Sequence, residues 1–112
     1  MYKVLNENTI KDCINNFVYT INEEEKAASI LHGPDKGVKV TIPRLFNYES
    51  KEYIVTSILE GAFIRSRIKS IDFESDSGLQ IINKGAFAYS FIETITLPSS
   101  CIDLKKGWCH NA

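Results

Sequence analysis

The chain has 112 residues, of which 44% are hydrophobic and 24% are charged, as is ordinary for one soluble globular domain. Its formal net charge of −1 argues against a nucleic-acid partner, which would need a concentrated basic face. No apolar run approaches the roughly 20 residues of a membrane-spanning helix, so we expect no membrane insertion.

The first 37 residues are predicted to form an N-terminal segment that ends in a capping hairpin. Residues 9–17 could begin with a capped, short helix that places Ile10, Ile14 and Phe17 on one side. Apolar residues then alternate on both sides of an acidic loop within "FVYTINEEEKAASIL", residues 17–31, which predicts a β-hairpin around residues 22–26. Such a hairpin would cover the apolar end of a repeat array.

Residues 38–112 are predicted to hold about two and a half to three repeats. The sequence Gly-Ala-Phe at residues 61–63 recurs 24 residues later at residues 85–87, and Ile68 and Ile71 align with Ile92 and Ile95. A weaker third copy contains Leu104 and Gly107, and "VKVTIP", residues 38–43, is a half-copy before the first. Internal repeats at such a period are typical of solenoids, in which each unit buries the apolar side of its neighbour.

Each repeat reads as a strand, a turn, a helical turn and a second turn. Apolar residues alternate at the end of residues 68–73, which predicts a strand. Residues 58–64 place Ile58, Ala62 and Phe63 at a spacing of about one helical turn. Residues 44–53 between the half-copy and the first repeat are predicted to form an irregular hairpin or loop. Stacked units would join their strands at residues 38–43, 68–73 and 92–97 into a parallel sheet.

The repeat, from "VTIPR" through "LEGAFIRS" to "NKGAFAYSFIETITLPSS", resembles the BspA-like leucine-rich repeat family over residues 38–109. The resemblance implies an α/β repeat fold: a right-handed leucine-rich-repeat solenoid with a parallel sheet on the concave face and short helical turns on the convex side. With the predicted hairpin cap, the chain would be one structural domain, a short or truncated member. Ser66 and Ser90 replace the family's usual cysteine, and Trp108-Cys109 replaces Ala-Phe.

The resemblance also carries an expectation about function. Known members of the family are mostly surface proteins of microbes and parasitic protists. We therefore expect adhesion or protein–protein recognition without catalysis, with a protein or glycan as the ligand. A cell-surface location is implied. The chain itself shows no signal peptide or anchor, so a cytoplasmic location is the alternative.

The candidate binding surface is the concave face of the predicted sheet. Residues between the inward-facing ones point outward from a strand, and stacking aligns them in columns. The predicted columns are Lys39/Ser70/Thr94 and Thr41/Asp72/Thr96, with Glu74 at the edge. The simpler interpretation of each residue is a polar group that keeps the sheet soluble. The alternative function is self-assembly as a homo-oligomer through an open C-terminal repeat that exposes Leu104 and Trp108.

No catalytic, cofactor or metal site is predicted. Cys109 adjoins His110, but neighbouring residues seldom face each other as nucleophile and base. Cys101, Cys109, His110 and His32 lack metal-ligand spacing, and the turn at residues 33–37 lacks the phosphate-loop pattern. The acidic run at residues 22–25 is typical of a hydrated loop. The three cysteines, Cys13, Cys101 and Cys109, are best interpreted as packed thiols, although a Cys101–Cys109 bridge stays open.

Overall fold

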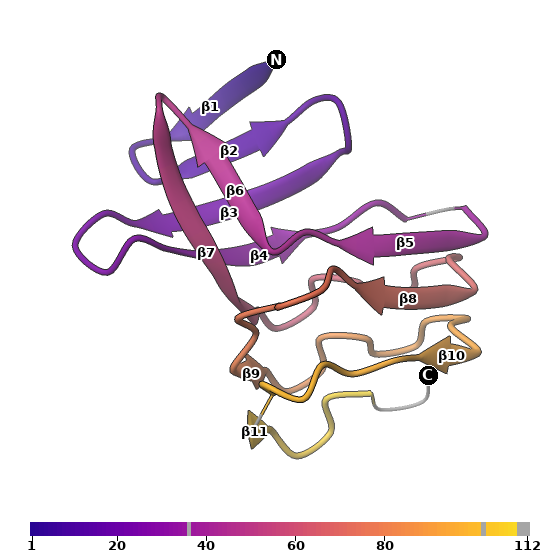
Figure 1. The fold of residues 1–112 in the computed structure, drawn as a ribbon. Coiled ribbons are helices and arrows are strands. Elements are labelled where there is room, and N and C mark those ends of the chain that lie inside the picture. The colour runs from indigo at the N-terminus through magenta and orange to yellow at the C-terminus, as the bar shows by residue number, and fades with distance from the viewer. Residues whose placement is uncertain (36, 102, 110–112) are drawn as a thin grey trace.

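The computed structural model describes residues 1–35, 37–101 and 103–109, and its strands form two sheets (Figure 1). In chain order the strands are β1 (Tyr2–Asn6), β2 (Thr9–Asp12), β3 (Phe17–Asn22), β4 (Ala27–His32), β5 (Lys39–Ile42), β6 (Leu45–Tyr48), β7 (Lys51–Ile58), β8 (Ser70–Phe73), β9 (Ile81–Ile82), β10 (Thr94–Ile95) and β11 (Asp103–Leu104). Within the described ranges no helix occurs, and so no helix there is long and apolar enough to cross a membrane.

The larger sheet is antiparallel at its N-terminal end and parallel at its C-terminal end. Its eight strands follow the order β1-β2-β3-β4-β7-β9-β11, with β6 paired to β7. The strands β1 to β4 form an antiparallel meander, and β6 pairs antiparallel with β7. From β4 onward the pairs β4–β7, β7–β9 and β9–β11 are parallel, so these four strands belong to successive coils.

The smaller sheet contains three parallel strands in the order β10-β8-β5, stacked beside each other in Figure 1. Lys39 lies opposite Ser70, and Thr94 lies opposite Ser70 on the other side. The predicted parallel pairing of residues 38–43, 68–73 and 92–97 is therefore observed. Isoleucine, valine and threonine dominate these strands because β-branched side chains pack well on a pleated surface.

The predicted α/β fold class is wrong, because the helical turns expected on the convex side do not occur in the residues that the structure describes, which form an all-β fold. Residues 60–65 and 84–89 form non-helical turns instead. In the first turn only alternate N–H groups bond locally, with Ala62 donating to Leu59 at 3.1 Å and Ile64 donating to Gly61 at 3.1 Å. This is half of the ladder that a continuous helical segment needs.

The other N–H groups of these turns bond to the next coil. Gly61 donates to the carbonyl of Gly85 at 3.2 Å, and Phe63 donates to that of Ala86 at 2.8 Å. The left-handed backbone of Arg65, with φ 56°, ends the turn before a helix can propagate. Hydrogen bonds between coils therefore replace those that a helix would make within one coil.

The predicted hairpin around residues 22–26 is present, and residues 44–53, predicted as an irregular hairpin or a loop, belong to a hairpin. The predicted helix at residues 9–17 is not present. β3 and β4 form the first hairpin, and β6 and β7 form the second. Residues 9–12 form the extended strand β2, paired with β3, so this expectation is wrong. The physical reason is burial: Ile10 is 1% exposed in the core, whereas Ile14, which the helix would have placed beside it, is 80% exposed.

The repeat array begins with β4, one strand before the half-copy at residues 38–43 that the sequence indicates. Ile30 in β4 pairs with Ile58, which in turn pairs with Ile82, and Ile82 pairs with Leu104. Each of these residues precedes a glycine by three positions: Ile-Leu-His-Gly, Ile-Leu-Glu-Gly, Ile-Asn-Lys-Gly and Leu-Lys-Lys-Gly. Strand β4 therefore closes the hairpin cap and starts the first of the four stacked coils that the described residues form.

A series of aromatic rings runs through the core from the N-terminal strands to the last coil. Phe17 lies 6.4 Å from Phe63, Phe63 stacks on Phe87 at 5.0 Å, and Trp108 meets Phe87 edge-on at 6.0 Å. The second hairpin joins the series where Phe46 stacks on Tyr19 at 4.1 Å. Each fully buried aromatic side chain contributes roughly 1.5–3 kcal/mol, so this series ties the cap to the repeats.

Candidate binding surfaces

The outward side chains of the smaller sheet lie in the columns that the repeat alignment predicts. Lys39, Ser70 and Thr94 occupy paired positions on β5, β8 and β10, and Thr41 lies opposite Asp72. Thr96 follows β10, where its N–H donates to the carbonyl of Ile71 at 3.0 Å. Parallel strands stand about 4.8 Å apart, so the side chains within one column are closely and evenly spaced.

The charges on this face largely neutralise one another. The Nζ of Lys39 lies 2.7 Å from the Oδ2 of Asp72, and both side chains are partly exposed. The hydrogen bond from Lys39, and more weakly its charge and a hydrogen bond from Thr96, lower the pKa of Asp72. Because both partners are accessible to water, the pair adds little to stability and mainly fixes the position of two side chains.

The remaining predicted residues differ in how available they are. The Oε1 of Glu74 accepts a hydrogen bond from the N–H of Arg44 at 2.6 Å, so this carboxylate stabilises the start of the second hairpin. The Oγ of Ser70 lies 3.4 Å from the carbonyl of Val38, a long hydrogen bond. Thr41 and Thr94 are exposed. The two threonines are therefore the groups that a ligand could contact without displacing an interaction of the fold.

The two residues predicted for self-association lie in different environments. Leu104 is 43% exposed on β11. Trp108 is partly buried and packs edge-on against Phe87, so its ring covers the end of the core. The structure thus presents Leu104 to solvent and directs Trp108 inward, and the association of two copies stays a prediction.

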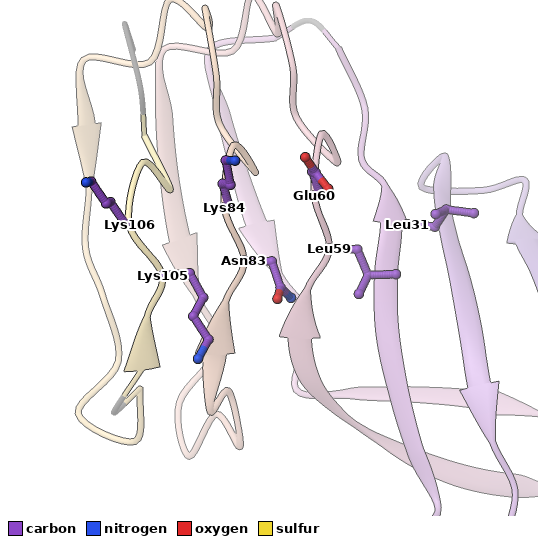
Figure 2. A pocket seen from close by; sticks show the side chains of 7 residues that line it. All are labelled: Leu31, Leu59, Glu60, Asn83, Lys84, Lys105 and Lys106. Atoms are coloured by element: carbon purple, nitrogen blue, oxygen red, sulfur yellow. The ribbon is translucent and has the colours of Figure 1, made fainter.

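A basic hollow at the C-terminal ends of the larger sheet's parallel strands was not predicted from the sequence. It has a volume of about 660 Å³, and its lining residues are Leu31, Leu59, Glu60, Asn83, Lys84, Lys105 and Lys106. Figure 2 shows Leu31, Leu59, Asn83 and Lys105 in one row across successive coils, with Glu60, Lys84 and Lys106 in a second row. The signal in the sequence is the pair of residues before each repeat glycine, which is Leu-His, Leu-Glu, Asn-Lys and Lys-Lys in turn, so that the lysines belong to the last two pairs.

The other candidates from the sequence do not form a reactive or metal-binding constellation in the part of the chain that the structure describes. No group of three or more His, Cys, Asp or Glu residues there could hold a metal ion. Cys13, Cys101 and Cys109 are free thiols, and His110 lies outside the described residues. The N–H of Gly33 donates to Ala62 at 3.0 Å, so it does not face a phosphate. In the acidic loop, the Nδ2 of Asn22 donates to Glu25 at 3.2 Å.

Comparisons with known proteins identify the fold. The structure is similar to the crystal structure of a leucine-rich repeat protein from Bacteroides capillosus ATCC 29799, with a TM-score of 0.63 and 23% sequence identity. The match covers 88% of this chain and 65% of that protein, so the chain spans about two thirds of its length. No protein-family model and no curated protein matches the sequence. The chain therefore has a leucine-rich-repeat-like fold, here built from strands and turns.

Proposed function

We propose that the chain is a non-enzymatic protein-binding module of the BspA-like type, acting in adhesion or recognition through the outer face of the smaller sheet. The observation that carries the proposal is the strand register, which places Lys39, Ser70 and Thr94 in one column and Thr41 beside Asp72. A rigid sheet with regularly spaced polar groups loses little conformational entropy when it binds a partner.

The local interactions on this face support the same proposal. The Lys39–Asp72 pair holds two charged side chains in a fixed geometry between the exposed Thr41 and Thr94. Such a surface offers both charges and both hydroxyl groups without a buried apolar anchor. A polar protein surface is the ligand that fits it, and the similarity to another leucine-rich repeat protein supports a binding role by analogy of fold.

The test is loss of binding on substitution of the two free threonines. The chain is immobilised, proteins from cells of its source are captured, and the captured set is compared with that of the double variant Thr41→Arg/Thr94→Arg. We expect the variant to lose at least one partner that the unaltered chain captures, because arginine would block both columns. The control variant Asn8→Arg/Gln80→Arg carries the same charge change at exposed positions away from this face, and it should retain every partner.

The outcome that contradicts the proposal is capture that is unchanged by the threonine substitutions. Circular dichroism of each variant, recorded beforehand, establishes that a loss of capture comes from the surface and not from unfolding. Capture that is lost equally in both double variants would also contradict it, because the loss would then follow charge and not position.

A further inference from the structure

Strand β5 forms one edge of the smaller sheet, and this edge is made by residues well inside the chain (Figure 1). In the order β10-β8-β5, the strand β8 covers one side of β5. The strand that precedes β5 in the chain, β4, pairs with β3 and β7 in the larger sheet. The hairpin cap therefore extends the larger sheet only, and no strand that the structure describes pairs with the other side of β5.

The free side of β5 presents the backbone groups of Lys39 and Thr41. The carbonyls of Val38 and Ile42 each accept a hydrogen bond at 3.0 Å from the neighbouring coil that contains β8. In a parallel pair every second residue bonds to the same neighbouring strand, so Val40 also directs its backbone groups toward β8. The N–H and C=O groups of Lys39 and Thr41 therefore point away from β8, where a further strand can pair with them.

These backbone groups match those of a second copy of β5 that runs antiparallel to the first. With a twofold axis at Val40, Lys39 of each copy lies opposite Thr41 of the other. In an antiparallel pair, residues that exchange both backbone hydrogen bonds alternate with residues that exchange none, and Lys39 and Thr41 are the residues free to make them. The two Val40 side chains, which pack against the core, lie opposite each other as a favourable β-branched pair.

The side chains at this edge favour the same register. Each Lys39 faces a threonine of the second copy, so no two like charges are directly opposite each other. A lysine on an edge strand often prevents pairing, but here the Nζ of Lys39 lies 2.7 Å from the Oδ2 of Asp72, which neutralises it. Val38, which is 75% exposed, lies opposite Ile42 of the second copy and loses part of its exposure. The edge is therefore complementary to itself in hydrogen bonds, charge and apolar contact.

We propose that two copies of the chain pair through β5 in this register, which joins their smaller sheets into one continuous sheet. A second copy is favoured over a strand of another protein because β5 itself supplies both members of each cross-strand pair. The contact is short, so the dimer is weak and forms at high protein concentration. This inference goes beyond the proposed binding function, and it places the outer columns of both copies on one face.

The test is the dissociation constant of the dimer, measured by sedimentation equilibrium at concentrations up to about 1 mM. Thr41→Pro removes the N–H that points to the second copy and leaves the bonds to β8 in place, so it should abolish the dimer. Thr41→Glu places a carboxylate opposite Lys39 of the second copy and should lower Kd roughly twofold to thirtyfold, because the contact occurs twice. Thr41→Lys should raise Kd by a similar factor. Within one chain the two charges act in the opposite direction, because Thr41 lies beside Asp72, so these shifts report on the contact between copies.

The control variants are Gln80→Glu and Gln80→Lys, which make the same charge changes at an exposed position just before β9 in the other sheet. They should leave Kd within about twofold of its original value, because they lie away from the contact. Amide hydrogen exchange gives an independent readout. The N–H groups of Lys39 and Thr41 should become protected as the protein concentration rises, whereas that of Val40, which faces β8, should be protected throughout.

Three results would overturn the proposal while leaving the proposed function untouched. The first is a chain that stays monomeric up to about 1 mM. The second is a dimer that Thr41→Pro leaves intact, because the contact would then lie elsewhere. The third is a shift of Kd in the same direction for Thr41→Glu and Thr41→Lys, a comparison that decides alone if circular dichroism shows Thr41→Pro to be unfolded. The proposed function is tested separately by Thr94→Arg on β10, which should lose captured partners and keep the dimer.

Discussion

At the scale of single residues, Ser66 and Ser90 hold the same place in neighbouring coils but differ in their hydrogen bonds. Both are buried, at 1% and 4% exposure. The Oγ of Ser66 accepts a hydrogen bond from the N–H of Ile68 at 3.2 Å. The Oγ of Ser90 is buried and has no partner among the described residues. A buried polar group without a partner costs free energy, so the two hydroxyl groups should have opposite effects on stability.

This difference gives a matched pair of substitutions. Ser66→Ala should lower the free energy of unfolding by about 1 kcal/mol, because it removes an acceptor from a buried N–H. Ser90→Ala should leave the free energy of unfolding unchanged or raise it by up to about 1 kcal/mol, because the hydroxyl is already unpaired. Urea denaturation followed by circular dichroism measures both. Equal destabilisation by the two substitutions would show that the two sites are in fact bonded alike.

The alignment of the repeats predicts which residues of the candidate site lie side by side on neighbouring strands. Ile71 aligned with Ile95 in the sequence, and this alignment alone put Ser70 beside Thr94 and Asp72 beside Thr96. The engagement of Glu74 with the N–H of Arg44 was not predictable, because it joins residues 30 positions apart across an irregular hairpin. A repeating sequence pattern does not predict a contact that occurs at one place in the fold.

At the scale of elements, the four glycines at the end of the coil strands have two different roles. Gly61, Gly85 and Gly107 adopt left-handed φ values of 74°, 68° and 76°, which disfavour other residues. Gly33 does not, but a Cβ there would fall on the buried ring of Phe63. The same repeat position therefore needs glycine for backbone conformation in three coils and for space in the first.

Substitution by asparagine distinguishes the need for a left-handed backbone from the need for space, because asparagine tolerates the left-handed region better than most other residues. Gly61→Asn should cost about 1 kcal/mol or less in the free energy of unfolding, since no atom lies within 4 Å of its Cβ position. Gly33→Asn should cost at least about 2 kcal/mol, because the Phe63 ring is 1% exposed and cannot move aside. Thermal and urea unfolding measure both, and an equal cost at the two positions would contradict the proposed packing.

The hairpins were easier to predict from the sequence than the turns of the repeats, for physical reasons. The hairpin of β3 and β4 follows from alternating apolar residues around a polar turn, whereas the pattern of residues 44–53 left a hairpin and a loop equally open. The turns at residues 60–65 were mistaken for helical because the spacing of Ile58, Ala62 and Phe63 fits any turn that directs all three inward. Nothing in the residue type of Arg65 or Tyr89 reveals a positive φ, which both adopt at 56°.

The alignment of the internal repeats did not identify β4 as part of the first coil, because the spacing between the first and second coils is irregular. Ile30 lies 28 positions before Ile58, whereas Ile58 lies 24 positions before Ile82. Strand β6 and the start of β7, which pair with each other, lie between β5 and Ile58 and change the period. The shared pattern Ile-Leu-x-Gly at residues 30–33 and 58–61 was the available signal.

At the scale of the whole molecule, the N-terminal segment and the repeats are joined by shared strands and a shared core. The predicted boundary at residue 37 falls between β4 and β5, yet β4 pairs with β7 in the same sheet. Phe17 and Phe46 belong to the same core cluster as Phe63 and Phe87. Since one coil cannot bury its own apolar side, we propose that residues 1–37 and 38–112 fold as one domain.

The most direct test of this account follows unfolding at both ends of the aromatic series. Amide NMR signals of Tyr19 in the cap and Phe87 in the third coil are recorded through a urea titration. We expect both native signals to disappear with one midpoint and one slope, because the rings between them form a continuous core. Loss of the Phe87 signal at a clearly lower urea concentration, with the Tyr19 signal intact, would contradict it.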